Sequence, residues 1–151
     1  SLSSECRYGM YDRILLPTDG SEHTLRAVEH AIDIAETRDA TLHIISVVDD
    51  RAFLVLDDER VDELRTELEE KALEAITEAA SRAEAHGIEP TTDVDTGNPA
   101  ECIVDYVERS DIDLVVMGTS GDDYEKNVVG SVSERVVGMS PAPVLTVGPD
   151  A

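Results

Sequence analysis

The fold of this chain is decided by the stretch LVVMGTSG at residues 114–121, which is followed by GSVSE at residues 130–134. The apolar run is typical of a buried strand, and the glycines after it allow a ligand to approach the backbone closely. The second segment predicts a helix that begins at Ser131, whose N-terminal N–H groups and dipole attract an anion. Together the two segments predict a strand, a glycine loop and a helix that hold a phosphate group through the backbone.

The same order of strand and helix is repeated along the rest of the chain. Strands are predicted at residues 11–17, 41–48, 91–96, 114–117 and 143–147. Helical periodicity separates them, with apolar stripes at residues 25–35, 61–83 and 103–107 and a shorter helix at 131–138. This alternation predicts an α/β fold with a doubly wound parallel sheet, right-handed crossovers and helices on both faces. Residues 91–96 carry alternating aspartates, which is typical of an edge strand.

Particular residues mark where the helices begin and end. Ser21 is expected to cap the first helix, and the run NPAE at residues 98–101 is a strong helix start. Gly87 is expected to end the long second helix, because glycine adopts the left-handed conformation easily. Residues 131–134 have the spacing of a capping box for the last helix. Residues 49–59 have an acidic composition that predicts a loop.

Two loops that could carry chemistry follow strands, one at residues 17–21 and the other at residues 117–131. Because parallel strands end at the same edge of a sheet, both loops are expected on one side of the molecule. Ligands of such sheets bind beyond the carboxyl ends of the strands, where the strand order reverses. The sequence therefore predicts a binding site between these two loops.

The charge of the chain is extreme, with 34 acidic and 12 basic residues and a net charge of −22 over 151 residues. The acidic residues are spread along the whole chain, which indicates a high-salt cytoplasm, where the Debye length falls to about 3 Å at 1 M salt. Such a surface excludes nucleic acid as a partner, because nucleic acid requires clustered Lys and Arg. No apolar run is long enough to span a membrane, so no membrane partner is expected and the protein is expected to be cytoplasmic.

The length fits a single domain at residues 10–151, with residues 1–9 expected to be a disordered extension or a cloning remnant. Cys6 and Cys102 do not make a zinc site, and Cys102 is expected to be a buried, inert thiol. The chain lacks GxxxxGK[ST] and GxGxxG motifs, which excludes P-loop and dinucleotide-binding domains. A phospho-receiver domain is also excluded, because the acidic and lysine positions that it needs are not occupied.

Both ends of the chain resemble the universal stress protein family. The stretch ILLPTDGS at residues 14–21 resembles the first strand and loop of the family, residues 116–136 its nucleotide loop, and PAPVLTV at residues 141–147 its closing strand. The resemblance covers residues 10–148, although the middle third matches only in its order of elements. It implies a flavodoxin-like sheet of five strands in the order 3-2-1-4-5, a homodimer paired through the last strand, and, in one branch of the family, bound ATP.

The resemblance also implies roles for particular residues. The adenine and ribose would be contacted by Pro17, Thr18, Asp19, Val47, Met117 and Gly118. The phosphates would be held by Gly121, Gly130, Ser131, Val132 and Ser133. The homodimer would be paired through Val144, Leu145, Thr146 and Val147. Asp19 could accept hydrogen bonds from ribose hydroxyls or form only a turn, and Ser131 could contact a phosphate or form only a helix cap.

The glycine loop departs from the ATP-binding pattern of the family in two ways. Eight residues rather than nine separate Gly121 from Gly130, and Asp122-Asp123 stands where the family often has a basic residue. The two carboxylates could bind Mg²⁺ together with phosphate oxygens, or they could belong only to a solvated acidic surface. Lys126 could reach a phosphate as a point charge.

These observations support three hypotheses for the function. The first is a protein that binds ATP, or AMP or ADP, with or without Mg²⁺, and acts in stress response or signalling by binding. Hydrolysis would at most be slow, since no nucleophile is paired with a general base. The second is a dimeric interaction module of the same fold that binds no nucleotide and uses the edge of the strand at residues 144–147. The third is a metal-dependent phosphotransfer enzyme that uses Asp19 with Asp122 or Asp123.

Overall fold

The computed structural model describes residues 10–54, 56–119 and 131–148. Within them the chain forms, in order, β1 (Arg13–Pro17), the short 3-10 helix η1 (Glu22–Thr24), α2 (Leu25–Arg38), β2 (Thr41–Asp49), the 3-10 helix η2 (Asp50–Phe53), α3 (Asp58–Ala85), β3 (Thr91–Gly97), α4 (Pro99–Arg109), β4 (Leu114–Gly118), α5 (Ser131–Met139) and β5 (Val144–Val147). Strands and helices alternate as the sequence predicts. None of the described helices is long and apolar enough to cross a membrane.

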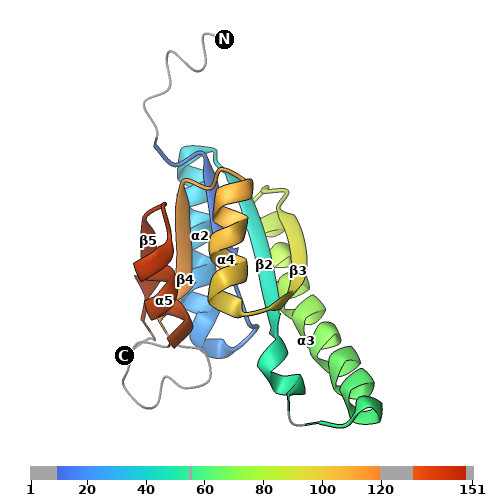
Figure 1. Ribbon diagram of the computed structural model, residues 1–151. Helices are drawn as coiled ribbons and strands as arrows, with labels where there is room; N and C mark the ends of the chain where they lie inside the picture. Colours follow the sequence, from blue (N-terminus) through green and yellow to red (C-terminus); the bar gives the residue numbers. More distant parts are fainter. Residues whose placement is uncertain (1–9, 55, 120–130, 149–151) are drawn as a thin grey trace.

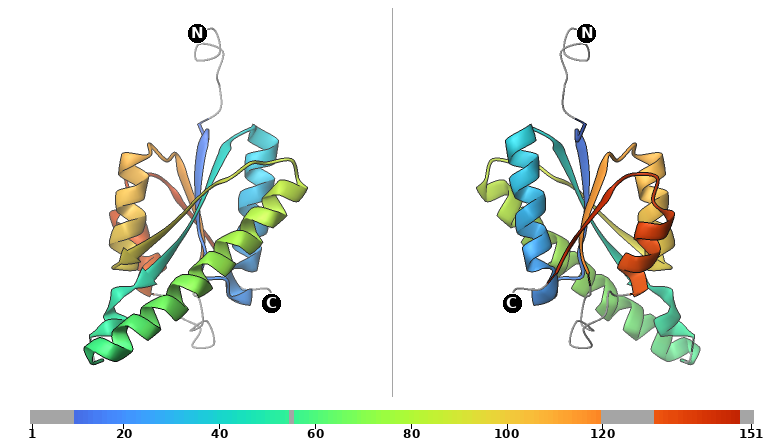
Figure 2. Two further views of the ribbon diagram at one scale, coloured as in Figure 1. Left: turned by 90° about the vertical axis from the view of Figure 1, so that its right-hand side faces the viewer. Right: turned by 90° about the vertical axis from the view of Figure 1, so that its left-hand side faces the viewer.

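The five strands form one parallel sheet in the order β3-β2-β1-β4-β5, which confirms the predicted fold and strand order (Figure 1). One face of the sheet is covered by α2 and α3, and the other face by α4 and α5 (Figure 2). After β1 the chain moves outward to β2 and β3, and it then returns past β1 to β4 and β5. The strand order therefore reverses between β1 and β4, where sheets of this kind bind ligands.

β1 lies at the centre of the sheet and is buried on both faces. Ile14, Leu15 and Leu16 have no exposed surface. Ile14 and Leu16 pack in the core beneath α2 and α3, whereas Leu15 packs in the core beneath α4 and α5. The side chains alternate because successive residues of a strand point to opposite faces. The continuous apolar run is thus what a central parallel strand requires, and it fixes where the loop after β1 leaves the core.

Two predicted helix ends agree with the structure and one does not. Asn98 caps α4, since its Oδ1 accepts the backbone N–H of Glu101 at 3.2 Å. Gly87 follows α3 with a φ of +79°. Ser21 was expected to cap the next helix, but its hydroxyl makes no capping bond. The reason is that Asp19 already turns the chain by accepting the N–H of Ser21, and η1 then precedes α2.

The long helix α3 differs from its prediction at the N-terminal end. It begins at Asp58 because Asp57 caps it by accepting the N–H of Arg60 at 3.0 Å. Residues 49–59 are therefore not one loop, since they also contain η2. The first part of α3 extends beyond the sheet, and the apolar stripe is only partly buried there (Figure 2). The buried residues of α3 are Ala72, Ala75, Ile76, Ala79 and Ala83.

Gly20 offers a test of how tightly the loop after β1 is packed. Its φ is +78°, and a Cβ added there would lie 2.9 Å from the Cβ of Ala75 in α3. Gly20→Ala is expected to lower the free energy of unfolding by about 2–4 kcal/mol, combining the left-handed backbone penalty with overpacking. Chemical denaturation measures this loss.

Gly87→Ala is the matched control, because Gly87 has a φ of +79° and nothing within 4 Å of the added Cβ. It should cost only the backbone penalty of roughly 1–2 kcal/mol. Adding Ala75→Gly to the Gly20→Ala variant removes the Cβ that the new methyl group meets, so, relative to Ala75→Gly alone, the loss at Gly20 should fall to that at Gly87. Equal losses at Gly20 and Gly87 would show that the loop is not packed against α3.

Candidate functional site

The candidate site lies at the carboxyl edge, by which we mean the edge of the sheet where the five strands end. In the described part of the chain this edge is formed by residues 17–21, 47–50, 97–98, 118–119 and 147–148 at the strand ends and by residues 131–133 at the start of α5. The register of Ile14 opposite Leu114 and of Leu15 opposite Val115 aligns the ends of β1 and β4. The two loops that the sequence singles out, at 17–21 and after 117, thus begin side by side (Figure 1).

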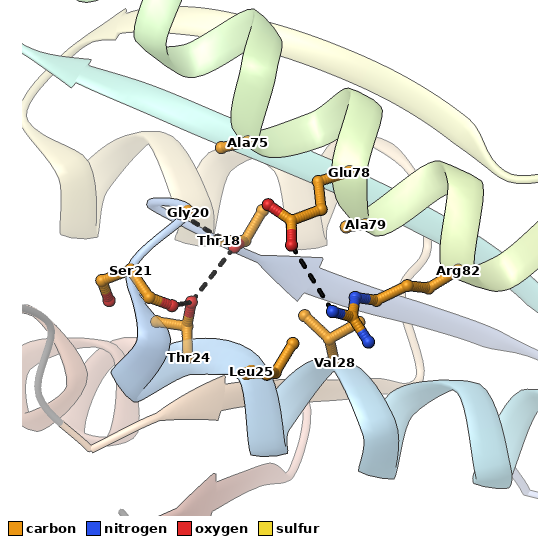
Figure 3. Close-up of a pocket in the computed structure, with 10 residues that line it drawn as sticks. All are labelled: Thr18, Gly20, Ser21, Thr24, Leu25, Val28, Ala75, Glu78, Ala79 and Arg82. Atoms are coloured by element: carbon orange, nitrogen blue, oxygen red, sulfur yellow. Dashed lines mark hydrogen bonds and ion pairs between the residues drawn. The ribbon is translucent and has the colours of Figure 1, made fainter.

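The loop after β1 is held by its own polar side chains (Figure 3). Asp19 Oδ1 accepts the backbone N–H of Ser21 at 2.9 Å, and Thr18 Oγ1 accepts the N–H of Gly20 at 3.2 Å. Thr24 Oγ1 lies 3.3 Å from Thr18 Oγ1 and 3.4 Å from Asp19 Oδ1. Thr18 and Thr24 are buried, whereas Asp19 is exposed. The arrangement leaves one face of the Asp19 carboxylate open at the edge.

The end of β2 leaves a backbone donor and acceptor next to that loop. Thr18 donates its N–H to the carbonyl of Ile45 at 2.9 Å, and this is the last backbone bond from the loop to β2 among the described residues. Backbone groups alternate sides along a strand, so Val47 presents its N–H and C=O to the same side as Ile45. β1 has already ended at Pro17 there. Val47 can therefore bind a planar, hydrogen-bonding ligand through its backbone.

The end of β4 is joined to the start of α5. Ser133 is only 2% exposed, and its hydroxyl donates to the carbonyl of Thr119 at 2.5 Å. Thr119 in turn donates its N–H to the carbonyl of Val147 in β5 at 3.1 Å. α5 includes Ser131 as its first residue, and Ser131 is exposed while Val132 is half-buried. The start of α5 is thereby fixed beside β4 with Ser131 facing outward.

The predicted site residues fall into three groups. The described residues brought together at the carboxyl edge are Pro17, Thr18, Asp19, Val47, Met117, Gly118, Ser131, Val132 and Ser133. Those outside the described residues are Gly121, Asp122, Asp123, Lys126 and Gly130. The predicted dimer residues form the third group. They make up β5, which is an edge strand of the sheet. Pro17, Thr18, Met117 and Gly118 are buried, so they can reach a ligand mainly through the backbone.

Cationic side chains near the edge already have partners. Arg51 forms an ion pair with Asp49 at the start of η2, with an Nε–Oδ1 distance of 3.0 Å. The hydrogen bond from Arg51 lowers the pKa of Asp49 below its usual range. Arg135 of α5 donates to Asn98 Oδ1 at 3.4 Å. The described part of the edge thus supplies little free positive charge, and an anion there would depend on backbone N–H groups.

Two polar contributions to the site were not predicted. Thr24 lies five residues beyond Asp19, and no motif marks it because the contact arises only when η1 turns the chain back. The bond from Ser133 to Thr119 spans 14 residues and depends on how α5 returns to β4. Neither contact follows from spacing alone.

The described residues provide neither a cluster of metal ligands nor a reactive thiol. They contain no group of three or more His, Cys, Asp or Glu side chains that could hold a metal ion. Burial, followed by the nearby charge of Asp95, raises the pKa of Cys102 to about 11. The thiol is therefore almost entirely protonated at neutral pH, as expected of an inert cysteine, although Cys102 is half-buried and not fully buried as predicted.

Comparison with known proteins identifies the family. A model of the universal stress protein family matches residues 10–148. The chain belongs to the universal stress protein family. It is 41% identical over 150 residues to a universal stress protein of Methanocaldococcus jannaschii, and the match covers 97% of this chain and 88% of that one.

Solved structures of the universal stress protein family have the same fold. The structure of hypothetical protein MJ0577 has a TM-score of 0.84 and 30% identity, and it covers 95% of this chain and 99% of its own. A universal stress protein in complex with cAMP has a TM-score of 0.71 and 27% identity, with 94% and 100% of the two chains covered. The predicted family and fold are therefore confirmed.

Ser133 in this universal stress protein fold is expected to be a structural tether. Ser133→Ala leaves the carbonyl of Thr119 without its 2.5 Å donor in a buried setting, so it should lower the free energy of unfolding by about 1–3 kcal/mol. Ser131→Ala is the control, because Ser131 is exposed and should change stability by less than about 1 kcal/mol. Denaturant unfolding that gives equal losses for both variants would contradict the tether.

Proposed function

We propose that this universal stress protein binds ATP or a related adenine nucleotide at the carboxyl edge, and that it acts in stress response or signalling by binding rather than by catalysis. The observation that carries the proposal is that Asp19 lies at the end of β1 next to the part of β2 that continues beyond β1, where the backbone of Val47 faces the side that β1 has left. The similar universal stress protein in complex with cAMP supports an adenine nucleotide as the ligand class.

The chemistry of the edge suits the three parts of such a nucleotide. Adenine presents a donor and an acceptor that the N–H and C=O of Val47 can match. The open side of the Asp19 carboxylate can accept hydrogen bonds from ribose hydroxyls. The N-terminus of α5, with Ser131 and Val132, can receive phosphate oxygens on backbone N–H groups, and Gly121 and Gly130 are proposed to extend that cradle.

The charge of the protein shapes how the phosphates are held. With a net charge of −22, the chain repels a free triphosphate at low ionic strength. Mg²⁺ bridges carboxylate and phosphate oxygens, so we propose that the nucleotide binds as its magnesium complex, with Asp122 or Asp123 as metal ligands. The acidic surface also supports the proposal that the protein works in a high-salt cytoplasm.

Titration calorimetry with Mg·ATP in molar KCl tests the proposal. The chain should give saturable binding heat below millimolar nucleotide. Asp19→Asn should weaken binding about 10- to 100-fold, because the loss of a hydrogen bond to a charged group costs about 1.5–3 kcal/mol.

Asp111→Asn is the matched control, since Asp111 lies between α4 and β4 at the opposite edge and its φ of 51° suits asparagine equally well. It should leave the affinity unchanged. Absence of heat at millimolar nucleotide would refute the proposed function.

We also propose a homodimer paired through β5. β5 pairs with β4 on one side only, and its other edge offers backbone groups for a second strand. Leu145 is 38% exposed, and Val137 and Met139 of α5 are 53% and 46% exposed. The dimer would bury the edge formed by Val144, Leu145, Thr146 and Val147. If no nucleotide binds, this surface supports the second candidate, an interaction module of the same fold.

Sedimentation velocity tests the dimer. Leu145→Lys should give a monomer, because each protomer would bring a charged side chain into the proposed apolar interface. Leu73→Lys is the control, since Leu73 is 53% exposed on α3 and should leave the dimer intact. A dimer that persists after Leu145→Lys would show that β5 is not the interface.

A further inference from the structure

We propose that Thr24 is a positioning residue for the ligand site, and that its hydroxyl, by donating to the Ser21 carbonyl, fixes the turn whose Ser21 N–H orients the Asp19 carboxylate for binding ribose. This inference rests on the proposed adenine-nucleotide function and adds to it a residue that does not touch the ligand. Thr24 is the last residue of η1 and precedes α2, and it is buried in the pocket between the loop and α3 (Figure 3).

The hydroxyl of Thr24 is the centre of a small polar network. Its Oγ1 lies 2.9 Å from the carbonyl oxygen of Ser21, 3.3 Å from Thr18 Oγ1 and 3.4 Å from Asp19 Oδ1. Thr18 Oγ1 also accepts the N–H of Gly20 at 3.2 Å. Every residue from 18 to 21 therefore bonds through a side chain or backbone group to this network.

The number of hydroxyl protons determines which groups donate and which accept in this network. A threonine hydroxyl has one proton to donate and two lone pairs to accept with. The shortest contact of Thr24, to the carbonyl of Ser21, takes its proton, and Thr18 can then donate to Thr24. Asp19 Oδ1 is occupied by the N–H of Ser21, whose own position is fixed by Thr24. Among the described residues Oδ2 has no partner, so it is the oxygen left for a ligand.

The loop at residues 18–21 is packed against α3, which restricts it to one conformation. Thr18 and Thr24 are each only 7% exposed, so bulk water cannot replace their hydroxyl contacts. Gly20 lies directly against Ala75 of α3, where even a methyl group would be 2.9 Å from the Ala75 Cβ. The cavity between this loop and α3 has a volume of about 20 Å³, which is room for about one water molecule. Loss of the Thr24 hydroxyl is therefore expected to change the orientation of the Asp19 carboxylate.

Calorimetry with two ligands, ATP and 2′,3′-dideoxy-ATP as magnesium complexes, tests the inference. The natural chain should bind ATP about tenfold more tightly, because only ATP offers ribose hydroxyls to Asp19. Thr24→Val keeps the shape of the side chain but removes the hydroxyl. It should reduce that preference to about twofold or less, through weaker ATP binding with unchanged dideoxy-ATP binding. Thr24→Ser should retain the preference.

Thr66→Val is the control for removal of a helical threonine hydroxyl, because Thr66 Oγ1 donates to the carbonyl of Asp62 on α3 and is exposed. It should retain the tenfold preference. If Thr24→Val weakens both ligands equally, Thr24 is only structural and the inference is wrong. If the natural chain binds both ligands equally, the inference is also wrong, although nucleotide binding stands. If it binds neither ligand, the proposed function and the inference fail together.

Discussion

The backbone N–H groups that follow β1 must find acceptors within their own loop, because the sheet no longer supplies them. The last ladder-type bond is from Thr18 N–H to the carbonyl of Ile45, and beyond it Gly20 and Ser21 donate to the side chains of Thr18 and Asp19. The bond from Gly20 is partly buried, where an unpaired backbone group is costly, and the exposed bond from Ser21 continues the same turn. This requirement places an acidic side chain at the reversal point of the sheet and fixes its direction.

The remaining features of the carboxyl edge depend on that loop. Since the loop turns away through η1, the backbone of Val47 stays uncovered on the side that β1 would otherwise occupy. On the other side of β1, the bond from Ser133 to Thr119 fixes the start of α5 beside the end of β4. Three backbone-rich surfaces thus meet around Asp19 with few free cations. Such a site selects a ligand by hydrogen-bond geometry, which suits a protein whose charge would otherwise repel anions.

Hydrophobic patterning and local turn chemistry predicted most of the fold. The apolar runs of β1, β2 and β4 identify strands, and the run at residues 98–101 marks the start of α4 because the capping bond is local. The cap expected at Ser21 was wrong because Asp19 competes for the same turn. The apolar stripe of α3 is only half-buried in its first part, which periodicity could not predict because it does not reveal where the sheet beneath a helix ends.

The position of the candidate site was predictable because parallel strands end at one edge. Its internal contacts were not, because Thr24 and Ser133 reach their partners only after helices return to the sheet. Asp122 and Asp123 lie outside the described residues, and their proposed part in binding follows from the sequence.

The most direct test of the central claim is an amide chemical-shift map of the ¹⁵N-labelled chain titrated with Mg·ATP in molar KCl. The account predicts that the largest shifts in the described residues occur at residues 18–21, at Val47 and at Thr119, around the end of β1. Saturable shifts that instead centre on the opposite edge, at Asp12 and Asp111, or on the part of α3 that extends beyond the sheet, would contradict it.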